Sequence, residues 1–543
     1  MQAQIDQTLI TTMIIEYLGN IADYISEHGS NSCRKLGSIF NRSKSSIDRE
    51  KQRSKARAEV PGASFFELSD GQSWLKKLVV AVVFIFGIHC GVGSEKLALF
   101  FSLLNIDLFV AVSKSSLARL ENRIDDLIIQ YKDKFDAKIK EKAANLSITP
   151  GGDETFFENI MLLVCMDLNS GFIFNEEIAE SRDHKTWESS SMPWLSKFKV
   201  IRSFLSDKAK ALLKLAKESL GVIHIPDLFH MMNAASKVMK FSFHRQKKGI
   251  EKQLKEVGCD IKQGIDIKEN KMKGAVLSNQ LVSLSQQQIK YQKSMRRFST
   301  TLHPFSVISS NQQSSTIVEN KMILSYEKIK HIQENLNIPD PKNKLGRVEK
   351  QIPEVSLQVD MWWQWVHNSL EYADIQQDVK DWLVHCLLPL VYWKNCIPKT
   401  RSKIIKRLYK ISRGVAEKNL DSHPLTSRLL KTNNSQSEWI DWAQEMAKLF
   451  IRTTSAIEGR NGWLSQIHFT GRGLSVKRIK TQTAIHNYML KRSDETTACE
   501  RLSGIKPDDM FEFIIQNIGP LAKPRKGKAR NNCNPLNLKS VPG

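Results

Sequence analysis

The chain has 543 residues, with 80 Lys and Arg against 57 Asp and Glu, which gives a formal net charge of +23. A hydrophobic fraction of 41% excludes a disordered chain, and 26 Gly and 16 Pro exclude a collagen-like or low-complexity one. A basic balance of this size favours a polyanionic partner, of which nucleic acid is the commonest, over a basic surface that serves solubility alone.

A basic segment and a set of helices are expected in the first part of the chain. Residues 31–62 carry nine Lys and Arg, which predicts a flexible or partly helical arm, either a solvated linker or a contact to the DNA backbone. Residues 73–137 have helical periodicity, with helices starting near Ser94 and Ser113. This order suggests a helix-turn-helix, but the connection exceeds the usual turn of about 3–4 residues, so a plain helical bundle is an equal alternative.

The pattern changes after Pro150, where short apolar runs alternate with turn residues. The run IMLLVCM at 160–166 is typical of a buried strand, and the turn DLNSG separates it from another strand that starts at Phe172. We expect this antiparallel hairpin to follow a first strand through Asp153. The next elements are predicted in this order: a strand at 199–205, a helix at 208–220 and a strand at 222–225.

Residues 246–439 are helical in pattern and predict an all-helical region. One heptad seam runs through Leu277, Leu281, Leu284, Gln288, Tyr291, Met295, Phe298 and Leu302. It favours an intramolecular helical hairpin over an oligomerisation coiled coil, because it covers only about 4 heptads. The Trp cluster at 361–365 is expected in the core rather than under a stacked base. The basic residues at 394–410 are either a solvated helix face or a phosphate-facing stripe.

Cysteine usage and apolar runs indicate the compartment. None of the eight cysteines forms a C-x-x-C pair, so a zinc ribbon or a thioredoxin-type site is disfavoured and reduced thiols in the cytoplasm are expected. The N-terminus lacks the basic start and continuous apolar core of a signal peptide. The longest apolar run, Leu78–Ile88, is shorter than the roughly 20 residues that span a bilayer, so no membrane association is expected.

Carboxylates at strand ends are the candidate chemical groups. The sequence has no phosphate-binding loop, no dinucleotide fingerprint, no G-x-S-x-G and no H-E-x-x-H motif. Asp153 lies in GGDETFF, Asp207 lies between a strand and a helix in SFLSDKAKALLKLA, and Glu458 lies in SAIEGRNGWLSQIH. Because hard divalent cations prefer oxygen ligands, acids at neighbouring strand ends, joined by a third on a helix across the sheet, suit a two-metal site.

Four further residues compete with these acids or lie near them. Asp167 also ends a strand, but its turn signature explains it, so Asp153 is preferred. Glu445 is a rival to Glu458 on helical grounds. For Asp227 and His230, just past the last strand, capping of the next helix is favoured over orienting a ligand or substrate. Gly459 and Gly462 suggest that the backbone beside Glu458 approaches DNA or a sheet closely.

The same segments, together with MDLNSGFIF and IPDLFH, resemble bacterial insertion-sequence transposases of the DDE class, which have an RNase H-like catalytic core. The likeness covers about residues 73–515 and extends to an uncharacterised bacterial group whose C-terminal half is filed as a domain of unknown function. It implies an α+β fold in which an all-helical insertion separates Asp207 from Glu458, 251 positions later. The expected parts are an N-terminal region with a basic arm (1–70), a helical domain (71–140), an RNase H-like core (145–245 plus 440–500), the helical insertion (246–439) and a C-terminal region with a basic tail (501–543).

The resemblance also implies the site and its partners. Asp153, Asp207 and Glu458 are expected to ligate Mg²⁺ or Mn²⁺, with two ions that support DNA cleavage and strand transfer. The residues expected to contact DNA are Lys208, Lys210, Arg460 and Asn461. The partners would be transposon ends and target DNA, with a homodimer or higher synaptic oligomer, in the cytoplasm at the nucleoid. The alternative is a non-catalytic DNA-binding protein derived from a transposase.

Overall fold

The computed structural model describes residues 24–25, 28–29, 31–62, 65–66, 68–371, 373–429 and 435–524. The protein is a mixed α+β chain that is mostly helical and contains a small mixed sheet. Most of the predicted basic tail lies outside the described residues. The chain forms two compact units: unit 1 comprises Met1–Ala137, Leu464–Thr497 and Lys506–Gly543, and unit 2 comprises Lys138–Trp463 and Ala498–Ile505.

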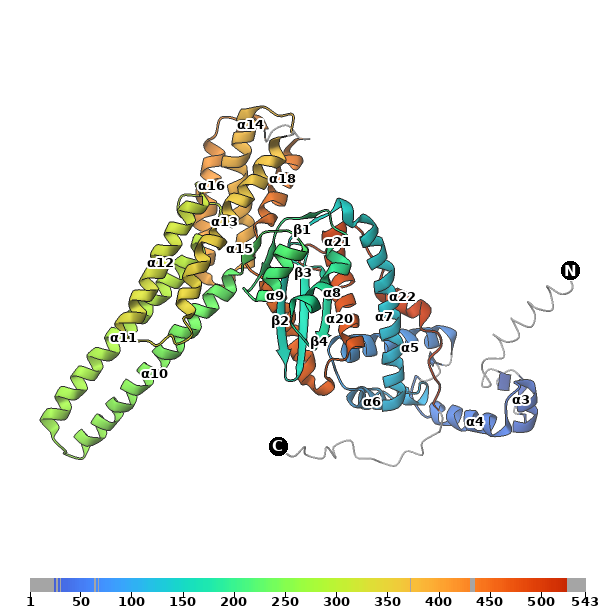
Figure 1. Cartoon of the computed structure of the whole chain (residues 1–543). Coiled ribbons are helices and arrows are strands. Elements are labelled where there is room, and N and C mark those ends of the chain that lie inside the picture. The colour runs from blue at the N-terminus through green and yellow to red at the C-terminus, as the bar shows by residue number, and fades with distance from the viewer. Residues whose placement is uncertain are drawn as a thin grey trace. The chain divides into compact units, whose positions relative to one another are not determined.

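A five-stranded sheet lies in unit 2 (Figure 1). Its strands are β2 (Pro150–Phe157), β3 (Ile160–Asp167), β4 (Ile173–Ala179), β6 (Phe204–Ser206) and β7 (His224–Pro226). Their spatial order is β4-β3-β2-β6-β7. β2, β3 and β4 form an antiparallel meander, whereas β6 runs parallel to β2 and β7 runs parallel to β6. The predicted hairpin and first strand are therefore confirmed.

The centre of the sheet is closely packed around two glycines of β2. A Cβ atom on Gly151 would lie 2.8 Å from Leu168, and one on Gly152 would lie 2.9 Å from Phe204. Because only glycine fits such close approaches, the pair lets β6 pair with β2 in the register Gly152 to Ser206. That register brings the residues after Gly152 and Ser206 to neighbouring positions in the sheet.

Short elements connect and cover the strands. The predicted strand at 199–205 is split into β5 (Val200–Ile201) and β6, and β5 pairs with β1 (Ser147–Ile148). Along the chain, α8 (His184–Leu195) lies between β4 and β5. After β6 comes α9 (Lys210–Lys214), which continues as η5 (Leu215–Ser219). The buried rings of Trp187 and Trp194 anchor α8 in the core.

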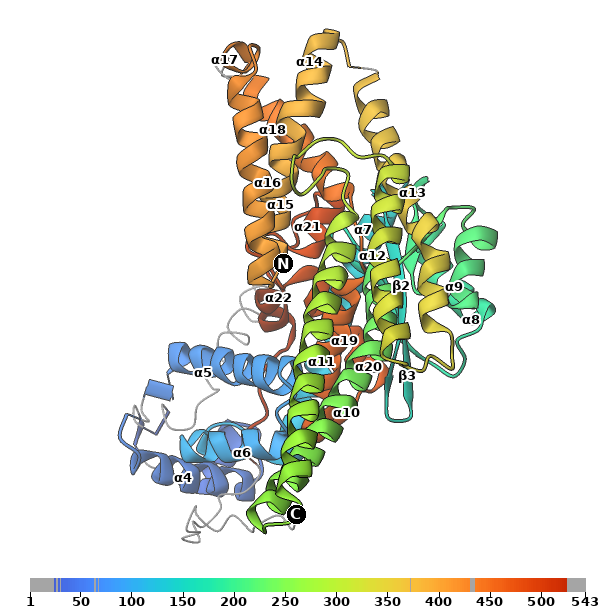
Figure 2. The same ribbon diagram turned by 90° about the vertical axis from the view of Figure 1, so that its left-hand side faces the viewer.

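A large helical region begins at Leu228, earlier than the predicted residue 246. Its helices are α10 (Leu228–Lys262), α11 (Ile267–Thr301), α12 (Ser315–Asn335), α13 (Lys344–Glu371), α14 (Gln377–Trp382), η6 (Leu383–Leu387), α15 (Leu388–Lys399), α16 (Lys403–Ser422), α17 (Thr426–Leu429) and α18 (Ser435–Leu449). The helices α10, α11 and α12 lie side by side (Figure 1, Figure 2).

The packing of this region confirms two sequence-based interpretations. The seam residues Leu284, Tyr291 and Phe298 of α11 are buried within the chain, so the heptads serve an intramolecular hairpin. The indole of Trp362 is buried and donates a hydrogen bond to the Met446 carbonyl at 2.8 Å, and that of Trp363 donates to the Gln313 carbonyl at 2.9 Å. These rings are core residues, as expected, and not stacking platforms.

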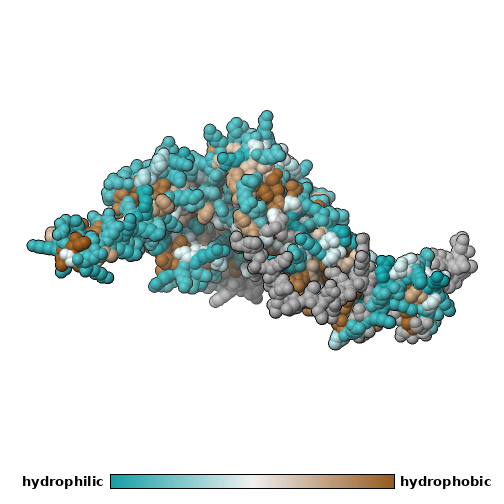
Figure 3. Space-filling view, turned by 90° about the horizontal axis from the view of Figure 1, so that it is seen from below, coloured by the Kyte–Doolittle hydropathy of each residue, from teal (hydrophilic) through white to brown (hydrophobic). Residues whose placement is uncertain are grey.

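The described part of unit 1 consists of helices and the loops that join them. Its longer helices are α3 (Cys33–Ile39), α4 (Lys44–Ala58), α5 (Ser69–Val82) continued by η2 (Val83–His89), α6 (Ser94–Leu103), most of α7 (Lys114–Lys142), α20 (Val476–Tyr488) and α22 (Met510–Asn517). The stretch Ser69–His89 is long and apolar enough to cross a membrane, but half of its apolar window is buried inside the protein. That burial is the pattern of a core helix. The face in Figure 3 is mostly hydrophilic, with apolar residues in small separate groups.

Candidate functional site

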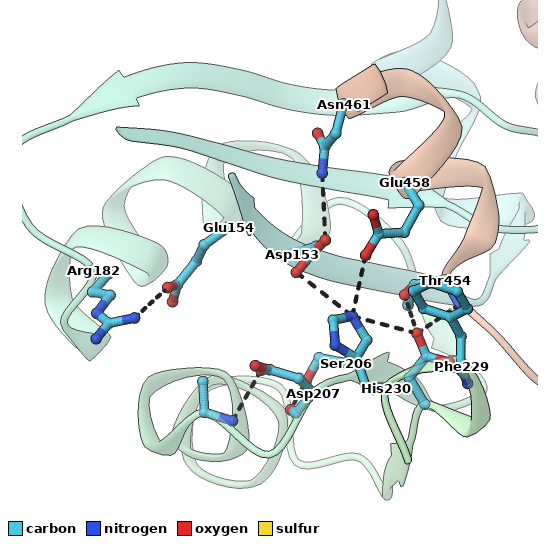
Figure 4. A network of polar contacts seen from close by, with 12 residues as sticks. Asp153, Glu154, Arg182, Ser206, Asp207, Phe229, His230, Thr454, Glu458 and Asn461 are labelled. Atoms are coloured by element: carbon cyan, nitrogen blue, oxygen red, sulfur yellow. Dashed lines mark hydrogen bonds and ion pairs between the residues drawn. The ribbon is translucent and has the colours of Figure 1, made fainter. Parts of the chain in front are cut away.

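Three side chains from three distant segments meet beside the centre of the sheet. Asp153 of β2, His230 of α10 and Glu458 of α19 (Ser455–Ile467) offer ligand atoms that all lie within 4.8 Å of one another. The Nε2 atom of His230 lies 3.5 Å from Glu458 Oε1 and 3.9 Å from Asp153 Oδ1. Figure 4 shows the three side chains pointing toward one another. We call this group the acid–histidine cluster.

Asp153 is placed by the strand and held by a neighbouring amide. It follows the two glycines of β2, its residue is only 7% exposed, and its Oδ2 accepts a hydrogen bond from Asn461 Nδ2 at 3.3 Å. The next residue, Glu154, instead forms an ion pair with Arg182 at 3.1 Å. Burial raises the pKa of Asp153 to about 7, with further increases from Glu458 and Asp207, although the nearby His230 lowers it. Burial is therefore the main reason why the charged form of Asp153 is disfavoured.

Asp207 is the first residue after β6 and lies next to the acid–histidine cluster. Because β2 and β6 pair in parallel with Gly152 opposite Ser206, Asp153 and Asp207 occupy neighbouring positions about 5 Å apart in the backbone. Asp207 accepts a hydrogen bond from the backbone N–H of Ala209 at 3.0 Å and acts on Asp153 through its charge. It is not among the three residues within 4.8 Å.

The sequence-based interpretation favoured helix capping over a ligand-orienting role for both Asp227 and His230. Asp227 caps α10 as expected, because its Oδ1 accepts from the Phe229 N–H at 2.6 Å. His230 does not cap the helix. Three residues beyond the cap, it lies on the side of α10 that faces the carboxylates, and its Nε2 is buried without a hydrogen-bond partner among the described residues. The D-x-x-H spacing at a helix start was the available signal, since residues three apart share a helix face.

A second contact of Asp227 sets the position of the glutamate helix. Its Oδ2 accepts from the backbone N–H of Thr454 at 3.1 Å and from the Thr454 hydroxyl. The Leu228 N–H donates to the Arg452 carbonyl at 3.1 Å. The start of α10 and the start of α19 are therefore joined, which fixes Glu458 relative to His230. The buried side chains of Ile457 and Leu464 hold the rest of α19 in the core.

Arg460 and Asn461 do not face solvent, contrary to the prediction that they contact DNA. Arg460 is 4% exposed and donates two hydrogen bonds to Glu176 of β4, at 2.8 and 2.7 Å. Asn461 is 6% exposed, and its side-chain amide donates a hydrogen bond to Asp153. The physical reason is helical spacing: both share the face of α19 that carries Ile457 and Leu464. Polar residues in an apolar stripe indicate a buried pair.

The two rival acids are accounted for differently. Asp167 is fully buried and accepts hydrogen bonds from Thr149 N, Ser170 N and Ser170 Oγ at 2.9, 2.8 and 2.6 Å. Its carboxylate therefore organises the turn after β3. Glu445 lies exposed on α18 and is outside the acid–histidine cluster.

Gly459 and Gly462 are exposed on α19, and a Cβ on either would meet no described atom within 4 Å. The protein's own packing thus does not require glycine there.

A basic cleft of about 1100 Å³ opens next to the cluster in unit 2. Asp207, Asp227 and His230 line one part of it, together with Lys208 and Lys210. Six more basic residues line the rest: Arg182, Lys214, Lys237, Lys344, Arg347 and Lys350. Lys208 forms an ion pair with Glu354 of α13 at 2.5 Å, whereas Lys210 is exposed. The wall formed by α10 and α13 was not assigned from sequence, because nothing local places α13 opposite the sheet.

One family model matches this chain over residues 383–530, and it describes a family of unknown function (DUF6399). The match includes Glu458, Arg460 and Asn461 but none of the sheet residues of the site. No curated protein matches the chain. The comparisons therefore attach no activity to the site.

Proposed function

We propose that this chain is a DNA transposase of the DDE class, in which Asp153, Asp207 and Glu458 hold divalent cations for DNA strand cleavage and strand transfer. The observation that carries the proposal is that Glu458 of α19 meets Asp153 of β2 in the acid–histidine cluster, next to Asp207 at the end of β6. Asp153 and Glu458 are 305 positions apart in the chain. Acids brought together over such a separation, without enough cations to neutralise them, are characteristic of a metal or catalytic site.

The sheet supports an RNase H-like core. The first three strands form an antiparallel meander, and the last two run parallel to the first, which lies in the centre. This is the arrangement expected of that fold, and it gives the first acid a central strand and the second acid the end of its parallel neighbour. The helical region inserted between β7 and α19 agrees with the layout that the transposase resemblance implies.

The residues of the site fit a divalent cation. Asp153, Asp207 and Glu458 supply the oxygen ligands that Mg²⁺ and Mn²⁺ prefer. The buried Nε2 of His230 is without a hydrogen-bond partner among the described residues, so this nitrogen would be available as one further ligand beside the carboxylates. A pair of bound cations neutralises charge on the attacking and leaving oxygens of an in-line displacement at phosphorus. Asn461 orients Asp153, and Asp227 fixes the helix that carries Glu458.

The basic cleft supports nucleic acid as the substrate. Its Lys and Arg side chains come from the sheet side (Arg182, Lys210) and from the helical region (Lys237, Arg347, Lys350). Side chains of this kind bind phosphates, and the affinity of such binding falls steeply as the salt concentration rises. A strand lying in this cleft would pass directly beside Asp207 and His230.

The test is a plasmid assay with the full chain. Supercoiled DNA is incubated with Mg²⁺ or Mn²⁺, and nicked and linear products are measured for the wild type and for Asp153→Asn. The proposal expects nicking that needs both the metal and Asp153. DNA binding without nicking under either metal would favour the non-catalytic alternative. Inverted repeats on both sides of the gene would support the transposase assignment independently.

A further inference from the structure

A small pair of helices in unit 1 has the local geometry of a helix-turn-helix. The helix α3 (Cys33–Ile39) is followed by four residues, and α4 (Lys44–Ala58) begins directly after them. Connections of about 3–4 residues join the helices of this motif. The pair lies in the segment whose sequence suggested only a basic arm. The helices predicted as a helix-turn-helix, α6 and α7, are instead joined by a longer connection that contains η3 (Ile106–Leu108).

Two positions make the sharp turn possible. Gly37 packs against the turn so closely that a Cβ atom would lie 2.7 Å from the Arg42 carbonyl oxygen, and its own carbonyl accepts the Arg42 N–H at 2.8 Å. Asn41 has a positive φ of 49°, a conformation that Asn tolerates better than most residues. Ser43 then caps α4 by accepting the Ser46 N–H at 3.2 Å. The turn is therefore specified by its sequence.

The two helices share a small core of their own. Leu36 of α3 and Ile47 of α4 are both 0% exposed, and they are packed with the partly buried Tyr24, Ile25, Cys33 and Phe40. The C-terminal half of α4 also contacts another part of unit 1, because the Arg57 guanidinium, which pairs with Glu50 of the same helix at 2.9 Å, lies over the ring of Phe109 at 5.6 Å. The C-terminal end of α4 is therefore in contact with Phe109.

The other half of α4 presents polar side chains to solvent. Lys44, Ser45, Asp48, Arg49 and Gln52 are all exposed, and they lie along one side of the first turns of the helix. Residues 33–58 carry nine Lys and Arg against two acids, so the surroundings of this face are strongly basic. In a helix-turn-helix, the N-terminal residues of the second helix contact base edges in the major groove. Arg and Gln there recognise guanine and adenine by paired hydrogen bonds.

We propose that α3 and α4 form a helix-turn-helix that reads base sequence in the major groove of duplex DNA, with Arg49 and Gln52 as the principal reading residues. This goes beyond cleavage and does not depend on the acid–histidine cluster. A solvated arm or a backbone contact would give affinity without sequence preference. Base reading by α4 gives a preferred sequence.

The experiment uses the full chain with EDTA, so that no strand is cut. A pool of duplexes with a random core is bound, the retained duplexes are sequenced, and affinities for the enriched duplex and a scrambled one are compared. The wild type is expected to enrich one short motif by about tenfold or more over the scrambled duplex. Arg49→Ala should reduce this preference about tenfold at one or two base pairs, while binding to the scrambled duplex changes little.

Two further variants separate base reading from charge. Arg49→Lys keeps the charge but loses the planar fork, so the preference should fall almost as far as in Arg49→Ala. Arg428→Ala removes an exposed arginine from α17 and should leave the motif unchanged. Glu458→Gln should also leave it unchanged, so that a failure of the cleavage proposal is recognised separately. The inference is overturned if the wild type enriches no motif, or if Arg49→Ala enriches the same motif equally well.

Discussion

Two groups of carboxylates lie at the sheet and at α19, which packs on it, yet their surroundings differ. Glu176 receives two hydrogen bonds from Arg460, and Asp167 receives three from the turn after β3. Asp153 and Glu458, by contrast, face each other across His230. The first group is saturated by the protein, whereas the second lacks enough positive charge to balance it. The first group contributes to folding, and under the proposed function the second group would hold a cation.

The sharpest test of this contrast is at Glu458. The change Glu458→Gln keeps the size and removes the charge, so it should leave folding and DNA binding intact while cleavage falls by about 10³-fold or more, because the cation loses an anionic ligand. Plasmid nicking and thermal unfolding measure the two effects. Glu445→Gln on α18 is the matched control and should cleave normally. If Glu445→Gln is the inactive variant, the third acid has been misplaced.

The saturated pair should respond in the opposite way. Arg460→Met removes the positive charge that is paired with the buried Glu176, which should lower the free energy of unfolding by about 3–5 kcal/mol. Chemical denaturation measures the loss. The double variant Glu176→Leu, Arg460→Met removes both charges and should recover most of it. Equal stability of Arg460→Met and wild type would show that the pair does not hold α19 on the sheet.

A third test concerns pH and the strand next to the site. Burial, with a smaller contribution from Lys208, lowers the pKa of His224 to about 4, and its Nε2 lies 2.8 Å from the Ser206 hydroxyl. The unfolded chain, with an ordinary pKa near 6.5, binds the proton more readily. Stability is therefore full above about pH 6.5 and is lost as the pH falls through about 4, by about 3 kcal/mol.

The measurement is a set of denaturation curves between pH 7.5 and 4 for the wild type and His224→Gln. The variant should lose less stability across this range, because it has no buried imidazole to protonate. Parallel curves for the two proteins would mean that His224 does not cause the acid sensitivity. The comparison between them cancels the titration of the remaining groups, including the acid–histidine cluster.

Cation binding should stabilise only the unbalanced group. At a Mn²⁺ concentration about 100 times the dissociation constant, a single site that exists only in the folded chain adds about 2.7 kcal/mol to the free energy of unfolding. Thermal unfolding with added Mn²⁺, and then with excess EDTA, measures this gain and its reversal. Asp153→Asn should show almost none of it. A gain of equal size in Asp153→Asn would place the ion elsewhere.

The sequence predicted the secondary-structure elements better than it predicted which face of a helix is buried. The strand at 160–166 was predicted from a local apolar run and a turn, and Asp153 and Glu458, which the structure brings together, were chosen from motif likeness. Arg460 and Asn461 were predicted to contact DNA, whereas they share a buried face of α19 with Ile457 and Leu464. In each case the missing information was which neighbour a side chain meets, and local patterns carry this only in part.

The two regions missed from the sequence show where the limits lie. The turn between α3 and α4 was overlooked although its signals are local: a small residue at Gly37, Asn41 at positive φ and a Ser cap at 43. The cleft wall on α13 has no local signal at all. Its lysines lie more than a hundred residues after Lys210, and only the folded helical region brings them opposite the sheet.

The smallest effect is expected at that wall, and it decides which basic surface holds DNA. The triple variant Lys237→Ala, Arg347→Ala, Lys350→Ala removes three exposed cations from the cleft. If each contacts a phosphate, the slope of log affinity against log salt should become shallower by up to about 3, with several-fold weaker binding at moderate salt. The control Lys403→Ala, Arg407→Ala, Lys410→Ala removes three exposed cations from one face of α16. Fluorescence anisotropy with a labelled duplex across a salt series compares them. An equal change in both would mean that DNA binds the basic surface as a whole, while a change in the α16 variant alone would move the DNA path away from the acid–histidine cluster.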